Sequence, residues 1–455
     1  MGNKWGTLKL SEFAFNASRR FDFKNKEKVV FINTGDVSSG KFLHKNLISS
    51  KGLPGQAKKA IRKGDILFSE IRPNNNRFAL VDFDDCGNFV VSTKFMVLEI
   101  NQEIMDLEFF YLLLTTPKTL SDFQHIAESR SGTFPQITFD AISHYPFPSP
   151  DKKNQQLIKK VLLDITNKMD ICSRINQTLE QMSQTLFKSW FVDFDPVIDN
   201  ALDAGNPIPE ALKSRAELRQ KVRNSADAKP LPADIRALFP VEFEETELGC
   251  VPRGWKEGSI PDIAFINSTS WGTKNQPDYV NYVDLSNAKD GIISSIEVIP
   301  FEDAPSRARR ILKKDDLIFG LVRPANRSFA YVHADGLTGS TGFAVVRAKN
   351  TIYKNFIYYF VTYDKNVEEL ARIADGGAYP AIKPDDICSL PLIIPPEEIV
   401  QRFDESTSNF RDLMNNSLVQ NDYLTALRDT LLPKLISGEL SLEDLPNLVA
   451  QTEPA

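Results

Sequence analysis

The sequence predicts an α+β protein with two globular domains in tandem, separated by two long helices packed as an antiparallel coiled coil. Three observations predict this pseudo-twofold repeat. They are an internal repeat offset by about 250 residues, short apolar runs bounded by turn residues, and apolar heptads at the end of each repeat. The 455 residues suffice for about three domains. The hydrophobic share of 42% and charged share of 25% are ordinary for a globular protein and argue against disorder.

The internal repeat is the strongest signal in the chain. The matches are collinear and extend over much of each half, so chance does not explain them. They indicate one type of domain present twice, with the second copy changed in detail. The matched segments are residues 61–79 with 312–330, which include Asp65 with Asp316 and Arg72-Pro73 with Arg323-Pro324, and residues 132–137 with 377–382.

Each repeat begins with a mixed globular domain, which we place at residues 1–150 and 249–395. Residues 106–120 predict a helix that ends near Pro117, and residues 355–371 predict its counterpart. Both domains end in a proline-rich stretch, which is a natural stop before a new element. In the first copy, short apolar runs predict strands at residues 29–32, 65–68, 78–81 and 89–91.

Each repeat ends in a predicted helical region, at residues 151–196 and 396–440, where apolar residues recur every seven positions. Asn176 and Asn421 occupy equivalent seam positions, where a polar residue lowers stability but can set the register, so we predict both to be helix-register residues. The alternative is two independent amphipathic helices, each packed on its own domain. The rows of the first region are Ile158, Ile165, Cys172, Leu179, Leu186 and Leu162, Met169, Asn176, Ser183; those of the second are Phe403, Phe410, Ser417, Leu424, Leu431 and Thr407, Met414, Asn421, Arg428.

The remaining segments carry weaker signals. Residues 197–248 are rich in proline and charge and predict a linker with one short exposed helix, and residues 441–455 predict a C-terminal tail. The first residues lack the apolar core of a signal peptide, and no run of about 18 apolar residues predicts a membrane span. The four cysteines have no CxxC spacing. We therefore expect a cytoplasmic protein without a membrane, disulfide or metal site.

Two segments resemble catalytic motifs. Residues 35–41 fit the spacing of a phosphate-binding loop, but Phe42 stands where such a loop needs Ser or Thr. A loop with a turn glycine is therefore the favoured interpretation. Asp65 and Glu70 resemble a nuclease carboxylate pair, but the second copy has Leu321 in place of Glu70. We favour a structural role for Asp65 and expect no catalytic residue in the chain.

Basic residues gather at equivalent places in the two repeats, although the formal net charge of −6 by itself argues against a nucleic-acid binder. Residues 51–77 and 304–330 each hold seven basic residues against two acidic ones, a local balance of +5. Lys and Arg neutralise phosphates, and Arg and Asn can make paired contacts to base edges. The alternative is a solvated charged face. The candidate DNA-binding residues are Lys58, Lys59, Arg62, Lys63, Arg72, Asn74, Asn75, Arg77, Arg307, Arg309, Arg310, Lys313, Arg323, Asn326 and Arg327.

The predicted helices bear on the kind of DNA site. A helix of about 40 residues is roughly 60 Å long. An antiparallel pair would hold two globular domains at its opposite ends, within reach of DNA segments roughly one turn or more apart. Two similar but non-identical domains on such a spacer predict a split, asymmetric target.

Three further stretches carry a resemblance that covers nearly the whole chain. They are residues 186–196 (LFKSWFVDFDP), 248–255 (LGCVPRGW) and 427–440 (LRDTLLPKLISGEL). In combination they are highly specific, and the chain resembles the specificity subunits of type I restriction-modification systems. The resemblance implies two target-recognition domains alternating with two helical regions, and no catalytic activity in this subunit.

The resemblance also implies partners and cofactors. A specificity subunit binds double-stranded DNA at a bipartite site together with two modification (methyltransferase) subunits, and two restriction subunits complete the full complex. The complex methylates adenine and uses S-adenosylmethionine, ATP and Mg²⁺, none of which this chain is expected to bind.

Two further sets of residues follow from the resemblance. The loops at residues 129–136 and 375–380 look like the Gly-x-aromatic-Pro loop that recurs in the family, which places Thr133 and Tyr379 near DNA; a simple packing turn is the alternative. Aromatic residues after the first heptads exceed what a two-helix seam can bury. We interpret them as contacts to a modification subunit, with packing under the linker as the alternative. They are Phe187, Trp190, Phe191 and Phe194.

Two other classes of function stay open at this point. The chain could be a self-contained methyltransferase or nuclease, although the motifs for binding S-adenosylmethionine and for amino methylation are missing from the sequence. It could also be an interaction scaffold in which the heptads are the function and the basic patches are incidental.

Overall fold

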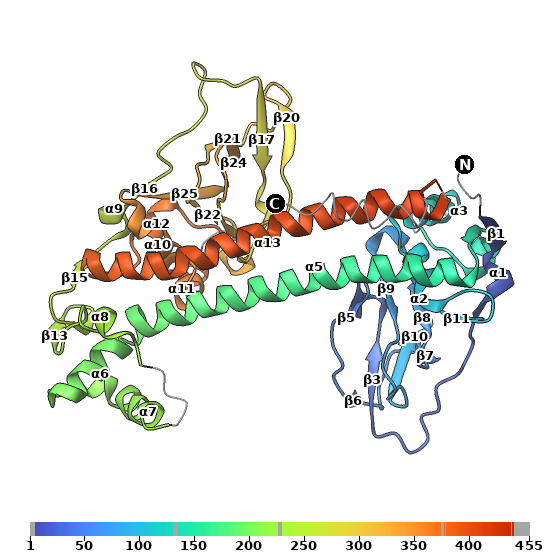
Figure 1. Ribbon diagram of the computed structural model, residues 1–455, viewed down its shortest axis with the longest axis horizontal. Coiled ribbons are helices and arrows are strands. Elements are labelled where there is room, and N and C mark those ends of the chain that lie inside the picture. The colour runs from blue at the N-terminus through green and yellow to red at the C-terminus, as the bar shows by residue number, and fades with distance from the viewer. Residues whose placement is uncertain are drawn as a thin grey trace. The chain divides into compact units, whose positions relative to one another are not determined.

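The computed structural model describes residues 5–130, 135–225, 230–374, 377, 379–437 and 439–440 (Figure 1). The chain forms two compact units, Met1–Asp170 with Asn421–Ala455, and Ile171–Gln420. The first is called the first unit and the other the second unit. The long helices α5 (Lys152–Phe187) and α13 (Glu397–Ser437) each contribute to both.

The first unit contains two four-stranded sheets, with strand orders β2-β11-β8-β9 and β6-β3-β10-β7. Strands β3 and β10 pair in parallel, and the other neighbours in these sheets are antiparallel. The predicted strands at residues 29–32, 65–68, 78–81 and 89–91 correspond to β3, β8, β9 and β10. The elements are β1 (Gly6–Lys9), α1 (Leu10–Phe13), β2 (Ala14–Asn16), β3 (Lys28–Ile32), β4 (Val37–Ser38), β5 (Lys41–Phe42), β6 (Ile48–Ser49), β7 (Ala57–Ala60), β8 (Ile66–Ser69), β9 (Phe78–Leu80), β10 (Phe89–Ser92), β11 (Phe95–Ile100), α2 (Leu107–Leu114), α3 (Pro117–Arg130), α4 (Phe139–Ile142) and β12 (Pro146–Ser149).

The second unit repeats this topology, with sheet orders β16-β25-β22-β23 and β20-β17-β24-β21. Here β17 and β24 are the parallel pair. The predicted repeat is therefore confirmed strand by strand. The elements are β15 (Lys256–Gly258), α9 (Ile260–Ile263), β16 (Ala264–Ile266), β17 (Tyr279–Val283), β18 (Ala288–Lys289), β19 (Ile292–Ile293), β20 (Glu297–Pro300), β21 (Ala308–Ile311), β22 (Leu317–Gly320), β23 (Phe329–Tyr331), β24 (Leu337–Ser340), β25 (Phe343–Ala348), α10 (Lys354–Val361), α11 (Asp364–Ile373), α12 (Pro384–Cys388) and β26 (Leu392–Ile394).

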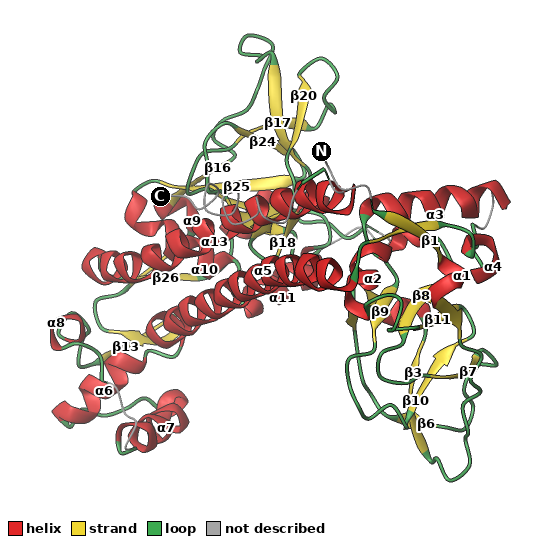
Figure 2. Ribbon diagram, turned by 45° about the vertical axis from the view of Figure 1, so that its right-hand side comes forward, coloured by secondary structure: helices red, strands yellow, loops and turns green. Residues whose placement is uncertain are grey.

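The central sheet of each unit is covered on both faces. In β8, Ile66 and Phe68 belong to one apolar cluster and Leu67 to another. In β22, Phe319 belongs to one apolar cluster and Ile318 to another. Successive side chains of a strand point to opposite faces, so a strand with two covered faces is apolar throughout. Figure 2 shows that the second sheet of each unit, with β3 and β6 or with β17 and β20, lies on the side away from that unit's long helices.

The long helices pack on each other with opposite directions, as the heptads predicted. In the second unit, the Cys172 thiol donates to Gln420 Oε1 (3.2 Å), and Asn176 Nδ2 donates to the Met414 carbonyl oxygen (3.2 Å). As residue numbers rise along α5, the numbers of the contacted residues in α13 fall, so the two helices are antiparallel. In the first unit, Ile158 of α5 shares an apolar cluster with Leu431 of α13. The alternative of two helices that never meet is therefore wrong, although both helices also join the cores of the units.

The helix predicted at residues 106–120 is interrupted. It ends as α2 at Leu114, and Pro117 begins α3, because a proline is well tolerated in the first turn of a helix. The second repeat has the same break between α10 and α11 without a proline. In both copies a threonine hydroxyl caps the end of the first helix by donating to a carbonyl four residues earlier, Thr115 to Tyr111 (2.9 Å) and Thr362 to Tyr358 (2.6 Å).

The predicted linker is folded, and the expectation of one short exposed helix is wrong. It contains α6 (Asp195–Ala204), α7 (Lys213–Arg223), α8 (Ala233–Arg236), and the hairpin of β13 (Phe243–Thr246) and β14 (Gly249–Pro252). Acidic residues four apart on α6 face basic residues four apart on α7. Such a stripe leaves little apolar periodicity to detect in α7, where Ala216 is the buried residue. The ion pairs are Asp195 with Arg215 (2.6 Å), Asp199 with Arg219, and Asp203 with Arg223.

No helix among the described residues is both long and apolar enough to cross a lipid bilayer. The four cysteines are free thiols. Within the described ranges, no group of three or more His, Cys, Asp or Glu side chains is arranged to hold a metal ion.

Candidate DNA interface

The same strained turn occurs once in each repeat, at the Arg-Pro pair. Arg72 has φ 44° and ψ 77°, and Arg323 has φ 50° and ψ 67°, both in the left-handed region. This region is costly for a residue with a Cβ, by about 1–2 kcal/mol. Each arginine precedes a short 3-10 turn, Pro73–Asn75 or Pro324–Asn326, and both arginines are exposed. We call this element the Arg-Pro turn.

The Gly-x-aromatic-Pro loop lies directly beside the Arg-Pro turn. In the first unit, Arg72 N–H donates to the Pro135 carbonyl oxygen (3.2 Å); in the second, Arg323 N–H donates to that of Pro380 (2.7 Å). The Arg323 guanidinium lies 4.9 Å from the ring centre of Tyr379, which is 72% exposed. Two of the predicted DNA contacts therefore lie together on the surface. Thr133 lies outside the described residues.

In the first unit, the basic patch divides into exposed and internally bonded residues. Lys59 Nζ donates to the Phe95 carbonyl oxygen (2.6 Å), and burial lowers the pKa of this amine. Arg77 donates to the Val37 carbonyl oxygen (2.9 Å). These two side chains hold the fold together and have little freedom to reach DNA. The exposed members of the predicted set are Lys58, Arg62, Lys63, Arg72, Asn74 and Asn75, of which Lys63 also pairs with Asp84 (2.9 Å).

In the second unit, more of the patch is bonded within the protein. Arg307 pairs with Asp284 (2.6 Å), and Arg327 pairs with Asp290 and Asp364 (2.7 Å each). The Arg309 guanidinium lies 4.7 Å from the ring centre of Phe301. Arg310 is half-buried, which lowers its pKa. Besides Arg307, the exposed members of the predicted set are Lys313, Arg323 and Asn326.

The buried aspartate of each repeat is structural. Asp65 is 2% exposed, pairs with Arg19 and accepts from Arg62 N–H (2.6 Å). Asp316 is fully buried, pairs with Arg347 (2.7 Å) and accepts from a backbone N–H in the same way. Each carboxylate ties the start of a central strand to a neighbouring segment, which is the chain after β2 in the first unit and β25 in the second. The structural interpretation of Asp65 therefore agrees with its surroundings.

The glycine in the phosphate-loop look-alike is a turn glycine. Gly40 has φ +87° at the β4–β5 hairpin, and a Cβ there would lie 2.9 Å from the Tyr111 hydroxyl. Gly291 has φ +92° and faces the Tyr358 hydroxyl, the equivalent pair in the second repeat. Both positions need glycine for its backbone and for its size.

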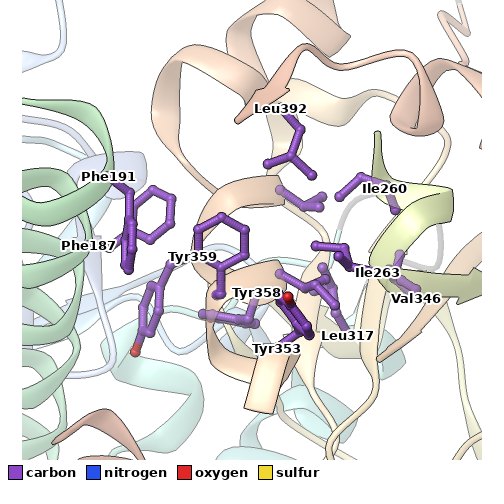
Figure 3. Packing of buried hydrophobic residues seen from close by; sticks show 14 of the residues in the cluster. Phe187, Phe191, Ile260, Ile263, Leu317, Val346, Tyr353, Tyr358, Tyr359 and Leu392 are labelled. Atoms are coloured by element: carbon purple, nitrogen blue, oxygen red, sulfur yellow. The ribbon is translucent and has the colours of Figure 1, made fainter. Parts of the chain in front are cut away.

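The aromatic residues proposed as partner contacts are buried within the second unit, so that interpretation is wrong for three of them. Phe187, Trp190 and Phe191 are less than a tenth exposed, and Figure 3 shows Phe187 and Phe191 packed toward Tyr359. Phe194 is half-buried, with its ring centre 5.6 Å from that of Trp255. Packing against the second domain and the folded linker is the alternative that the structure supports.

A buried arginine in α13 was not predicted. Arg411 is 6% exposed, and its guanidinium lies 3.9 Å from the ring centre of Tyr358 and 4.9 Å from that of Tyr359. It also pairs with Glu180 of α5 (3.6 Å). The heptads gave no signal for it, because Arg411 directly follows Phe410 at a position that flanks the seam, where a charged residue is usual.

The two seam asparagines differ in what they contact. Asn176 is buried, and its bond to the Met414 carbonyl spans the seam. Asn421 is half-buried in the first unit. The register role of both residues stays a prediction.

The fold and these surfaces define a class: a protein with two similar but non-identical α+β domains, each presenting an exposed Arg-Pro turn and basic patch, joined through paired helices. Three comparisons make the class specific. Residues 3–181 match the family model described as type I restriction modification DNA specificity domain. The chain is 36% identical over 475 residues to the type I restriction enzyme HindI specificity subunit of Haemophilus influenzae, covering 96% of this chain and 99% of the relative.

A second relative is the type I restriction enzyme MjaIX specificity subunit of Methanocaldococcus jannaschii, 24% identical over 348 residues, or 74% of this chain and 70% of that one. The crystal structure of a type I restriction-modification system S subunit from M. genitalium supports the fold, with a TM-score of 0.51 at 13% identity over 95% of this chain and 96% of that chain. The chain belongs to the family of type I restriction enzyme specificity subunits.

Proposed function

We propose that this chain is the DNA-recognition subunit of a type I restriction-modification complex and performs no catalytic step itself. The domains at residues 1–150 and 249–395 would each bind one half of a bipartite, asymmetric site in double-stranded DNA. The observation that carries the proposal is the recurrence of the exposed Arg-Pro turn, beside a basic patch, on two domains of equal topology. Two similar domains that differ in detail suit two half-sites that differ in sequence.

The paired helices would have two tasks in this proposal. They would set the separation of the half-sites, and they would dock two modification subunits, with two restriction subunits completing the complex. S-adenosylmethionine, ATP and Mg²⁺ would then be used by those subunits, in the cytoplasm, during adenine methylation and cleavage.

A different surface now suits the modification subunit better than the buried aromatic residues do. Ile171, Ile175 and Met182 lie on one stripe of α5 outside the seam and are 56%, 44% and 48% exposed. Their spacing of four and seven residues places them on one helical face. An exposed apolar stripe of this kind is typical of a surface that a partner covers. We expect Ile175→Glu to weaken binding of the modification subunit, while Gln177→Glu, an exposed position on another face of the same helix, leaves it unchanged.

The proposal is tested by mixing the purified chain and its modification subunit with a library of labelled duplexes that contain split random sites. Selection should yield one bipartite sequence, bound with an affinity that falls steeply as salt rises. Equal affinity for every duplex would contradict the proposal, and methyl transfer by the chain alone would contradict its non-catalytic part.

A further inference from the structure

The two Arg-Pro turns raise a question about specificity, because they are equivalent while the half-sites are expected to differ. The two arginines have the same residue type, nearly the same φ and ψ, and the same backbone bond to the neighbouring loop. A backbone that both domains hold in the same way suits a contact that both half-sites can offer. The shared part of duplex DNA is its phosphodiester backbone, and phosphate contacts position a protein without specifying bases.

The residues beside each turn do differ between the repeats. In the first unit, Gln136 Nε2 donates to Glu70 Oε2 (2.9 Å), so a polar pair flanks Arg72. The second unit has Leu321 and Ala381 at the two equivalent positions.

The backbone places these pairs on the same short ribbon as the arginines. Ile71 bridges to Gln136, and Ile137 N–H donates to the Glu70 carbonyl oxygen (2.8 Å). In the second repeat, Val322 bridges to Ala381, and Ile382 N–H donates to the Leu321 carbonyl oxygen (2.9 Å). The first residue of each pair therefore lies two positions before its arginine, and all four side chains are at least partly exposed.

The chemistry of the two pairs suits different bases. Carboxylate and amide groups can bond to the amino and ring nitrogen atoms that cytosine and adenine present in the major groove, whereas an apolar pair suits the methyl group of thymine. We propose that Arg72 and Arg323 are positioning residues that hold the DNA backbone, and that Glu70 with Gln136 and Leu321 with Ala381 determine base preference in their respective half-sites. This assignment rests on the proposed function.

The strained backbone suggests the variants that test the arginines. Arg72→Gly and Arg323→Gly remove the side chain while keeping a left-handed turn that alanine would adopt only with strain. Arg72→Lys and Arg323→Lys keep the positive charge but not the guanidinium. Lys221→Ala removes an exposed charge from α7 and is the matched control. Thermal unfolding of each variant verifies that the units stay folded.

The experiment uses the full chain with its modification subunit and the selected duplex, together with duplexes altered at one base pair at a time. Each Arg→Gly variant should weaken binding to all duplexes by the same factor. It should also make the plot of log K against log[salt] shallower by about 0.9, the value for one phosphate contact. The Arg→Lys variants should retain most of the wild-type slope. Lys221→Ala should change neither quantity.

The double variant Glu70→Leu/Gln136→Ala should change base preference and not the salt slope, which is the reverse of what we expect for the Arg→Gly variants. It imports the pair of the second repeat, so the salt slope should stay unchanged while the preference at one or two base pairs of one half-site changes by about tenfold or more.

Three results would overturn the assignment. They are a loss confined to one base pair in an Arg→Gly variant, an unchanged salt slope in that variant, and an unaltered base preference in the double variant. If instead the unsubstituted chain binds all sequences equally, the proposed function itself has failed, so the two failures are distinguishable.

Discussion

The buried Asp–Arg pair offers a sharp test of the packing argument, because the two repeats build it in different ways. In the first unit the arginine is Arg19, on the segment after β2, and Glu99 stands in β11. In the second unit the arginine is Arg347, which occupies the position of Glu99 in the matching strand, and Thr269 stands where Arg19 would be. The aspartate is present in both repeats, whereas its arginine partner comes from the segment after β2 in the first and from β25 in the second.

We predict that Arg19→Thr destabilises the central sheet of the first unit by about 3 kcal/mol. Asp65 is nearly inaccessible, and removing one partner of a buried ion pair costs about 3–5 kcal/mol because it leaves the other charge unpaired. The lower end applies because the Arg19 side chain is 19% exposed. The double variant Arg19→Thr/Glu99→Arg recreates the arrangement of the second unit and should recover most of the loss. Glu99→Ala, which removes only an exposed pair, should cost at most about 1 kcal/mol.

Hydrogen exchange of the β8 and β11 amides is the suitable assay, because a chain with two units need not unfold in one transition. A loss of about 3 kcal/mol corresponds to exchange that is faster by roughly two orders of magnitude. Wild-type exchange in Arg19→Thr would show that the pair contributes little. Failure of the double variant to slow exchange relative to Arg19→Thr would refute the equivalence of the two arrangements.

Three further predictions concern the second unit and the seam. Arg411→Met should destabilise the second unit by about 3 kcal/mol, since it leaves the Glu180 carboxylate, which accepts from the Tyr359 hydroxyl, without its cation. Arg411→Met/Glu180→Gln should restore part of this in the same exchange assay, and no difference between the two variants would count against the pair. Burial, with a smaller effect of the Arg411 charge, lowers the pKa of His333 from 6.5 to about 4. The folded state thus keeps the neutral imidazole, and up to about 3 kcal/mol of stability should be lost as pH falls from 6.5 to 4. The difference between the wild type and His333→Phe in their plots of unfolding free energy against pH measures this loss. Parallel plots for the two proteins would contradict it. Asn176→Leu/Asn421→Leu should fold but accept a wider range of half-site spacings, measured on duplexes with spacers of increasing length, and an unchanged preference would argue against a register role.

Much of the fold could be predicted because its signals are local or repeated. Alternating contacts on two covered faces explain why the first three residues of β8 and of β22 are all apolar. The heptads located the seam, and Ile158, Leu162 and Leu424 are buried as expected. The equivalence of Arg72 and Arg323 was visible in the sequence, since a repeat compares the chain with itself.

The misjudged features depend on partners distant in the sequence. Nothing near Trp190 reveals that Phe239 will cover it, so an aromatic cluster suggested an exposed contact. The linker looked flexible because its helices are joined by charged pairs such as Asp195 with Arg215 rather than by apolar faces. Arg77 looked available to DNA, yet it bonds to a carbonyl oxygen 40 residues away.

The sequence alone determined that this protein has two copies of one domain, paired helices and two basic patches, because repetition, heptad spacing and charge are properties of residue order. Only the tertiary structure decided which members of each patch are exposed and which are bonded within the protein. It also revealed that Arg72 and Arg323 adopt the same strained backbone beside differing neighbours. A left-handed turn is held by contacts with a loop some 60 residues away, and those contacts exist only once the chain has folded.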